Sequence, residues 1–223
     1  MRTLKILKPT HCEKVYDIAA GIFQELYGKI TGYTPEIVTE PADCDMAVIG
    51  SDAVNNFVAG LLFDKKFNGF GFRYGTDDYN IKSLELDGHN LLMLAGGRGR
   101  STIYAVYDFF ERQAGCRYFW DGDIIPTADS VDITALDIFE SPRFEYRGLR
   151  YFAHRSLHRF QAEHWSLEDW QKEIDWMLKK RLNMFMLRIG HDDMYQRAFP
   201  DIVDYPDYDK KLPEAGGGYD DRT

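Results

Sequence analysis

Five residues in the C-terminal third of the sequence have side chains that suit a polyhydroxylated ligand: His154, Arg155, His191, Asp192 and Asp193. A ring hydroxyl of a sugar needs a donor and an acceptor together, and imidazole, guanidinium and carboxylate groups supply both. These five residues are therefore predicted to bind a carbohydrate substrate. The structural alternative is that the two aspartates cap the segment that follows them and that the histidines are solvated.

A second candidate is the glycine-rich turn at Gly97 and Gly99, which stands between an apolar stretch and a helical pattern. Such a turn can direct backbone amides toward a phosphate. However, Thr102 occupies the place of the third glycine of a dinucleotide-binding turn, and no Gly-Lys-Ser/Thr sequence follows as in a P-loop. We favour the structural alternative, in which glycine is needed for the dihedral angles of the turn and for close approach of a strand and a helix.

Metal ligation is the third chemistry. His191 with Asp193, or His154 with His158, would supply two ligands. A zinc site needs three or more ligands with a defined spacing, and the sequence does not show them. Neither a metal nor any other cofactor is expected.

The five candidate ligands follow the ends of two predicted strands. Tyr146–Phe152 and Asn183–Ile189 read as strands, and Leu167–Lys180 between them reads as a helix. Ser166 and Asp169 have the spacing of a capping box at the start of that helix. A strand, helix and strand with a right-handed crossover form the building unit of a parallel barrel, in which active-site residues follow the C-terminal strand ends.

Strands and helices also alternate over residues 1–140, which predicts an α/β domain of the α+β type, with a mixed sheet and flanking helices. A hairpin or a meander is expected around the polar turn Gly75–Asp78, and Asp129–Pro142 is expected to be a linker or a final edge strand. The predicted strands are Leu4–Leu7, Glu36–Thr39, Met46–Ile49, Phe70–Arg73, Ile81–Leu86, Leu91–Ala95 and Tyr118–Trp120, and the predicted helices are His11–Tyr27, Ala53–Leu62 (capped by Asp52) and Ser101–Gln113.

Composition and charge exclude some classes of protein. The hydrophobic fraction of 44% allows a core of useful size. A net charge of −9 argues against nucleic-acid binding, which needs clustered basic residues. Three widely spaced cysteines, Cys12, Cys44 and Cys116, form neither a disulfide framework nor a zinc spacing, so we expect three reduced thiols.

The sequence contains no run of the roughly 18 apolar residues that a membrane span needs. Residues Met1–Pro9 lack the apolar core of a signal peptide. We therefore expect no membrane interaction and a cytoplasmic location, or secretion if the N-terminus is incomplete.

Two sets of residues resemble known glycoside hydrolases. Gly96 and Gly97, the helical segment Ser101–Glu111 and the strand Gly115–Phe119 look like the N-terminal accessory domain shared by family 20 hexosaminidases, α-glucuronidases and α-N-acetylglucosaminidases. Tyr146-Arg147-Gly148 resembles the first barrel strand of such enzymes. The chain is also similar to family 89 α-N-acetylglucosaminidases, and this likeness rests on Trp170–Met177, Asn183 and Tyr195-Gln196-Arg197.

The resemblance implies an accessory α/β domain over residues 1–140 and, over residues 141–223, the first strand–helix–strand unit of an incomplete (β/α)8 TIM barrel. It implies carbohydrate metabolism and a glycan substrate ending in an amino sugar or a uronic acid. The sequence departs from family 89 at Gly190-His191-Asp192-Asp193, where the family tends to carry Gly-Gln-Glu, so the identity of the sugar stays open.

No catalytic residue is assigned. A retaining glycosidase needs two carboxyl groups about 5 Å apart, and the resemblance places such a pair on later barrel strands. A complete barrel needs roughly 250 residues, so we expect this chain to be the N-terminal fragment of an exo-acting glycoside hydrolase, inactive alone and prone to self-association through exposed barrel surface. The alternative is a non-catalytic carbohydrate-binding or interaction module.

Overall fold

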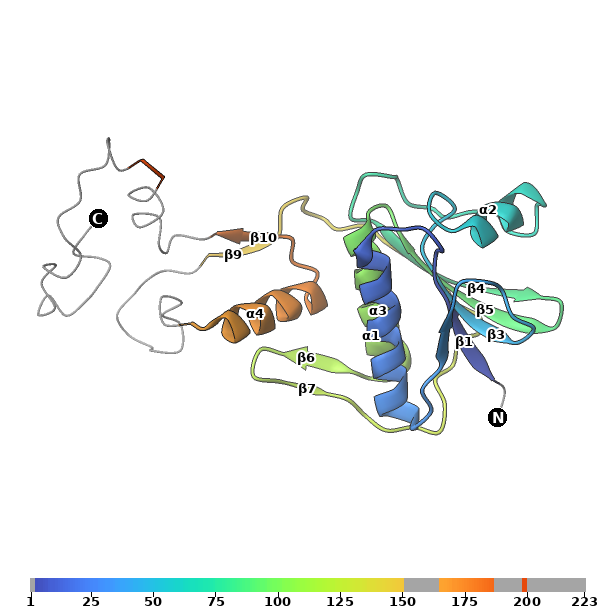
Figure 1. Cartoon of the computed structure of the whole chain (residues 1–223), viewed down its shortest axis with the longest axis horizontal. Coiled ribbons are helices and arrows are strands. Elements are labelled where there is room, and N and C mark those ends of the chain that lie inside the picture. Colours follow the sequence, from blue (N-terminus) through green and yellow to red (C-terminus); the bar gives the residue numbers. More distant parts are fainter. Residues whose placement is uncertain (1–2, 151–164, 187–197, 200–223) are drawn as a thin grey trace, which may run out of the picture. The chain divides into compact units, whose positions relative to one another are not determined.

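The computed structural model describes residues 3–150, 165–186 and 198–199 (Figure 1). By their contacts, the residues form two units: Met1–Glu145 with Trp176–Arg181, and Tyr146–Asp175 with Leu182–Thr223. The helices are α1 (Lys14–Thr31), α2 (Asn56–Phe63), α3 (Gly99–Gln113) and α4 (Leu167–Lys179). The strands are β1 (Leu4–Leu7), β2 (Glu36–Val38), β3 (Asp45–Ile49), β4 (Tyr79–Leu86), β5 (His89–Gly96), β6 (Arg117–Phe119), β7 (Gly122–Ile124), β8 (Asp137–Glu140), β9 (Gly148–Arg150) and β10 (Met184–Met186).

The first unit is built on a six-stranded mixed sheet with the order β2-β1-β3-β5-β4-β8. Strands β2, β1, β3 and β5 pair in parallel, whereas β4 pairs antiparallel with both β5 and β8. Strand β8 is therefore the edge strand that the sequence offered as one reading of Asp129–Pro142. The predicted mixed sheet with flanking helices is confirmed.

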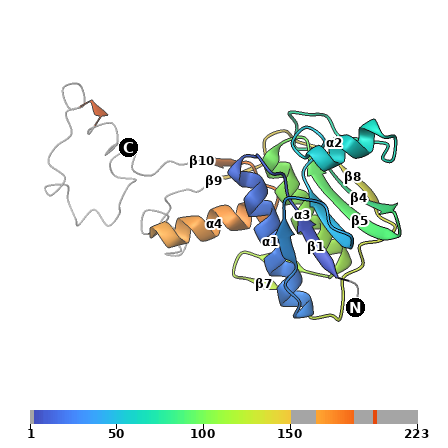
Figure 2. The ribbon, with the colours of Figure 1, turned by 45° about the vertical axis from the view of Figure 1, so that its right-hand side comes forward.

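Alternate residues of the central strands enter two separate cores. Leu92 and Leu94 of β5 pack in a core with α1 and α3, and Leu91 and Met93 pack in a second core with Leu61 of α2. Since successive side chains of a strand point to opposite faces, α1 and α3 cover one face of the sheet and α2 covers the other. Figures 1 and 2 show α1 and α3 running side by side.

Helix α1 ends at Thr31, four residues later than the sequence predicted. The helix continues through Gly28 and is capped by Gly32, which takes the left-handed conformation (φ 74°) and donates its amide to the carbonyl of Gly28. The apolar pattern continues as well, because Ile30 is buried. Gly28 instead allows the close approach of Thr34, whose Oγ1 would lie 3.1 Å from a Cβ at position 28.

The predicted hairpin has a different partner. No strand forms at Phe70–Arg73, and β4 pairs along its whole length with β5. Asp87 and Gly88 connect the two strands with positive φ values of 51° and 84°. An Asp-Gly pair is a strong signal for such a two-residue turn. The sequence therefore contained the correct turn, and the interpretation of Gly75–Asp78 as the hairpin loop was wrong.

Helix α2 begins three residues later than predicted, and Asp52 is not its cap. Asn55 is the N-cap residue: its Oδ1 accepts the amide of Phe57 at 3.1 Å, and its Nδ2 donates to the carbonyl of Ile49 at 3.0 Å. Asp52 instead accepts the hydroxyl of Tyr74. The start of α2 is thus tied to the end of β3 by one buried amide.

Replacing Asn55 with alanine is expected to lower the free energy of unfolding by about 1–2 kcal/mol, because both a helix cap and a buried hydrogen bond are lost. Urea unfolding followed by circular dichroism measures this. D52A is the control and should cost less than about 0.5 kcal/mol, because its partner is exposed. Equal losses in the two variants would contradict the assignment of Asn55 as the cap.

The predicted strand–helix–strand pattern is present, and it lies in the second unit except for the last residues of α4, Trp176–Lys179, which belong to the first. Strands β9 and β10 pair in parallel, and α4 lies between them in the chain. The capping box is confirmed, since the amide of Asp169 donates to Ser166 Oγ at 3.2 Å and the amide of Ser166 donates to Asp169 Oδ2 at 2.9 Å. Trp170 of α4 packs edge-on against Phe185 of β10, with 5.3 Å between ring centroids.

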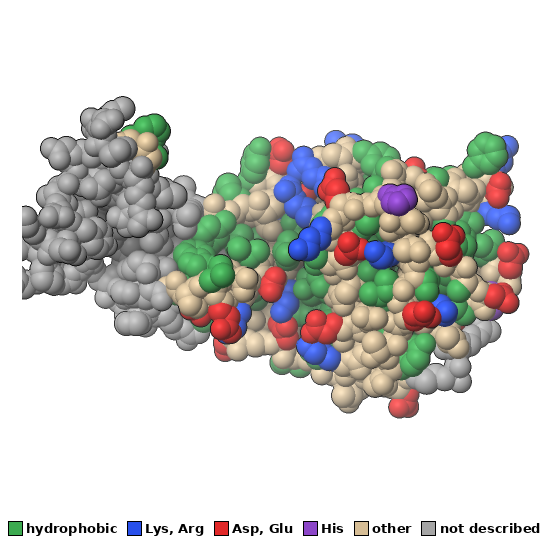
Figure 3. Space-filling view, in the orientation of Figure 1, with side chains coloured by type: hydrophobic (Ala, Val, Ile, Leu, Met, Phe, Trp, Pro, Cys, Tyr) green, Lys and Arg blue, Asp and Glu red, His purple; other side chains and the backbone are tan. Residues whose placement is uncertain are grey.

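Acidic and basic side chains are interspersed on the face drawn in Figure 3. No helix that the structure describes is long and apolar enough to cross a membrane. Within the same residues, no three His, Cys, Asp or Glu side chains are grouped to hold a metal ion.

Candidate functional site

The two strands that precede the candidate sugar ligands end at one edge of their sheet. The parallel register pairs Gly148 with Met184 and Arg150 with Met186. The C-terminal ends of the two strands, Arg150 and Met186, therefore lie at the same edge of the two-stranded sheet. In a parallel barrel, this is the edge that carries the active site.

The five sequence-predicted ligands, His154, Arg155, His191, Asp192 and Asp193, lie outside the described residues. His158 and the motif Tyr195-Gln196-Arg197 lie outside them as well. The structure describes the strands β9 and β10 that precede these residues in the chain, but not the residues themselves. The five assignments therefore stay predictions.

The opposite ends of β9 and β10 are held by a small set of hydrogen bonds. Asn183 Oδ1 accepts the amide of Arg147 at 2.8 Å, and the amides of Asn183 and Met184 both donate to the carbonyl of Arg147, at 2.8 and 3.1 Å. A Cβ at Gly148 would lie only 2.7 Å from the carbonyl oxygen of Met184. The Arg147-Gly148 pair and Asn183, noted in the sequence, thus set the register of the two strands.

A methyl group at Gly148 should force β9 away from β10. We expect G148A to destabilise the second unit by about 1–3 kcal/mol, the usual cost of overpacking. Hydrogen exchange of the amides of residues 184–186 measures the effect, which should be faster exchange there and no change in β5. G21A is the matched control, since nothing lies within 4 Å of its new Cβ on α1, and it should be neutral or stabilising. Unchanged protection of β10 in G148A would contradict this account of the register.

The glycine-rich turn at the start of α3 is closed by its own hydrogen bonds. The amide of Gly97 donates to the carbonyl of Asp78 at 2.9 Å, and the amide of Arg98 donates to Ser101 Oγ at 2.9 Å. The amides of Ser101 and Thr102 donate to the carbonyl of Arg98. These amides are therefore not directed at a ligand.

Packing explains the glycines of this turn. A Cβ at Gly97 would lie 2.3 Å from the carbonyl oxygen of Arg73, and a Cβ at Gly99 would lie 2.4 Å from Val15 Cγ1. The neighbouring Arg100 Nε donates to the buried carboxylate of Asp77 at 2.8 Å. The structure supports the structural reading of the turn over the phosphate-binding one.

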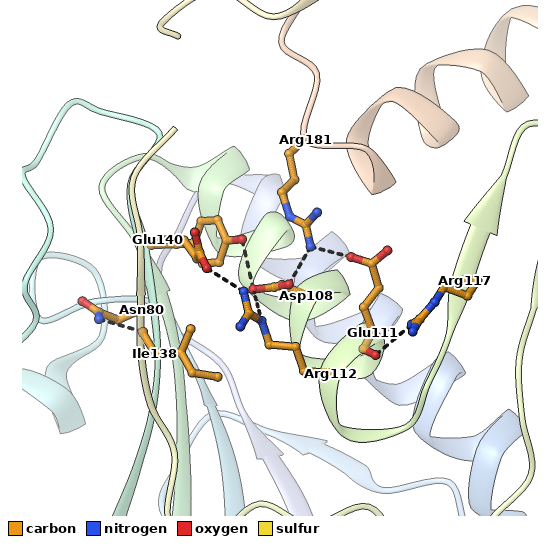
Figure 4. Close-up of polar contacts among 9 residues, drawn as sticks. Asn80, Asp108, Glu111, Arg112, Arg117, Ile138, Glu140 and Arg181 are labelled. Carbon is orange, nitrogen blue, oxygen red and sulfur yellow. Dashed lines mark hydrogen bonds and ion pairs between the residues drawn. The ribbon is translucent and has the colours of Figure 1, made fainter. Parts of the chain in front are cut away.

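A buried ionic cluster on α3 was not foreseen from the sequence (Figure 4). Asp108 is its centre: Oδ1 accepts Arg181 Nη2 at 2.7 Å, and Oδ2 accepts Arg112 Nε at 2.9 Å and the hydroxyl of Tyr79 at 3.1 Å. Arg181 Nη2 also donates to Glu111 Oε2 at 2.5 Å. All of these residues belong to the first contact unit.

The charges of this cluster shift the pKa values of its members. Burial is the main cause that raises the pKa of the Tyr79 hydroxyl, and the adjacent Asp108 adds to it. Burial opposes the charged form of Arg181, but the carboxylates of Asp108 and Glu111 outweigh it and raise the pKa of the guanidinium. Tyr79 therefore stays neutral and Arg181 stays charged across the physiological range.

Known proteins resemble this chain in sequence and in fold. No protein-family model matches the sequence. Human alpha-N-acetylglucosaminidase is 22% identical over 125 residues, which are 56% of this chain and 16% of that enzyme. A family GH115 4-O-methyl-alpha-glucuronidase with specificity for decorated arabinogalactans superposes on 83% of this chain with a TM-score of 0.58, at 12% identity and over 25% of its own length. The chain therefore shares the fold of the matching part of that alpha-glucuronidase.

A mutant Streptomyces plicatus beta-hexosaminidase in complex with its product GlcNAc aligns over 82% of this chain and 29% of its own, with 11% identity and a TM-score of 0.48. The chain thus spans between a sixth and a third of the length of the proteins it matches.

Proposed function

We propose that this chain carries the N-terminal part of an exo-acting glycoside hydrolase whose substrate is a glycan ending in an amino sugar or a uronic acid. The observation that carries the proposal is the parallel β9–α4–β10 unit, because strand, helix and parallel strand are the repeat of a (β/α)8 barrel. The likeness to the alpha-glucuronidase supports it, since that likeness extends over 83% of the chain.

In this proposal residues 1–140 form the accessory domain, and residues from 141 onward begin the catalytic barrel. His154 and Arg155 after β9, and His191, Asp192 and Asp193 after β10, bind hydroxyl groups of the terminal sugar. The shared edge of the two parallel strands supports this grouping. The acid/base and nucleophile carboxylates belong to later strands of the barrel.

The first strand–helix–strand unit of a barrel exposes apolar side chains that further units would cover. Leu167 and Ile174 on α4 and Met184 on β10 are large apolar residues with exposed side chains. We propose that the 223-residue chain self-associates through this surface.

Sugar binding by the full 223-residue chain tests the proposed function. Saturation-transfer NMR with millimolar methyl N-acetylglucosaminide, methyl glucuronide and methyl glucoside should give stronger transfer to one of the first two sugars than to the glucoside. D192A and D193A should abolish that preference, whereas E25Q, an exposed change on α1, should not.

Aryl glycosides of the same sugars should not be hydrolysed by the chain alone. Equal transfer to all three methyl glycosides, or none to any, would refute the proposed binding role. Hydrolysis that disappears when an acid of this chain is removed would refute the placement of the catalytic carboxylates.

A further inference from the structure

Arg181 has a backbone conformation that arginine rarely adopts. It follows the end of α4 with a φ of 59°, and its amide donates to the carbonyl of Leu178 at 3.0 Å. This is the left-handed position after a helix, where glycine is usual because it has no Cβ. An L-residue there costs roughly 1 kcal/mol. A glycine would adopt this backbone conformation with less strain. We therefore infer that the interactions of the guanidinium favour arginine at this position.

The guanidinium makes charged hydrogen bonds to two carboxylates of one helix. Arg181 Nη2 lies 2.7 Å from Asp108 Oδ1 and 2.5 Å from Glu111 Oε2, and the Asp108 side chain is 5% exposed. Asp108 and Glu111 are three residues apart on α3 and therefore on one face of it. Figure 4 shows both carboxylates directed toward Arg181.

The residues just before Arg181 make further contacts within the same unit. Met177 is buried, and Leu178 packs against the core that α1 and α3 share. Lys179 Nζ lies 2.6 Å from Asp123 Oδ2, and Lys180 Nζ lies 5.8 Å from the centroid of the Phe119 ring. Each residue from 178 to 181 thus contacts α3, the β6–β7 hairpin or the adjoining core.

We propose that α3 and the β6–β7 hairpin form an intramolecular recognition surface for the end of α4, and that Arg181 is the residue this surface recognises. Asp108 and Glu111 are the acceptors, and the strained backbone of Arg181 is held because these charged hydrogen bonds outweigh the strain. This assignment does not depend on the proposed sugar binding.

Replacing Arg181 with glycine separates the two roles of the residue. R181G relieves the backbone strain and removes the guanidinium. If the only role of Arg181 were to end α4, this change would make the end of the helix more stable. We expect the opposite: amides of residues 176–181 should exchange with deuterium at least about tenfold faster than in the parent chain, while those of β5 keep their protection. R181K, which keeps the charge without the fork geometry, should give an intermediate rate.

Lys65→Gly is the matched control. Lys65 occupies the corresponding position after α2 with the same φ of 59°, and its side chain is exposed. K65G should leave exchange unchanged or slower around α2. E111Q should reproduce part of the R181G effect, and combining E111Q with R181G should add little to R181G alone.

Equal or slower exchange of residues 176–181 in R181G would overturn the proposal. Faster exchange that spreads equally to β5 would overturn it too, because Arg181 would then stabilise the core of the first unit as a whole and would not act on the end of α4.

Discussion

D108A is expected to lower the free energy of unfolding of the first unit by about 2–3 kcal/mol, the usual cost of losing charged hydrogen bonds and leaving a buried polar group unsatisfied. The carboxylate of Asp108 is 5% exposed and accepts hydrogen bonds from Arg112, Arg181 and the hydroxyl of Tyr79. Alanine would remove this shared acceptor, although Arg112 would keep Glu140 and Arg181 would keep Glu111. In a chain of this size, the midpoint of thermal unfolding should fall by roughly 4–12 °C.

An exposed ion pair provides the control for D108A. Glu25 and Lys29 pair at i and i+4 on α1 with both side chains more than half exposed. E25Q should therefore change stability by less than about 0.5 kcal/mol. Calorimetry or chemical unfolding of both variants measures the difference, and a D108A loss as small as that of E25Q would show that the cluster contributes little to stability.

F23A is the second substitution with a large expected effect. Phe23 is fully buried between α1 and α3, and its ring lies 5.1 Å from that of Phe110 and 5.8 Å from that of Phe109, measured between centroids. Truncation to alanine removes this packing and leaves a cavity, which typically costs about 3–5 kcal/mol. Urea unfolding followed by tyrosine and tryptophan fluorescence should show an earlier midpoint.

Ile18 on the same helix is the comparison for F23A, because its side chain is 43% exposed. I18A should cost less than about 1 kcal/mol. If the two variants lose equal stability, the α1–α3 contact is not the centre of this core.

The sequence predicted most of the elements because local patterns decide them. The apolar run of β5, the amphipathic pattern of α1 and the capping box at Ser166 and Asp169 were all visible. The wrong hairpin partner for β4 arose from choosing between two turns: the Asp87-Gly88 pair fits a two-residue turn, and Gly75–Asp78 only resembled one.

The ionic cluster could not be predicted in the same way. Arg181 and Asp108 are separated by 73 positions, and neither belongs to a motif that indicates the other. Their pairing depends on the packing of α3 and the end of α4 in the first unit. A charged residue within the largely buried α3 was the available signal, since a carboxylate in such a helix requires a partner.

The first contact unit is discontinuous in the chain, since it is made of Met1–Glu145 and Trp176–Arg181. During synthesis, the carboxylates on α3 leave the ribosome long before the arginine that pairs with them. At about 5–20 residues per second, the interval between Glu145 and Arg181 is roughly 2–7 s. Over that interval, the nascent chain contains Asp108 and Glu111 but not yet Arg181. A recombinant version cut near residue 140 would lack Arg181 altogether.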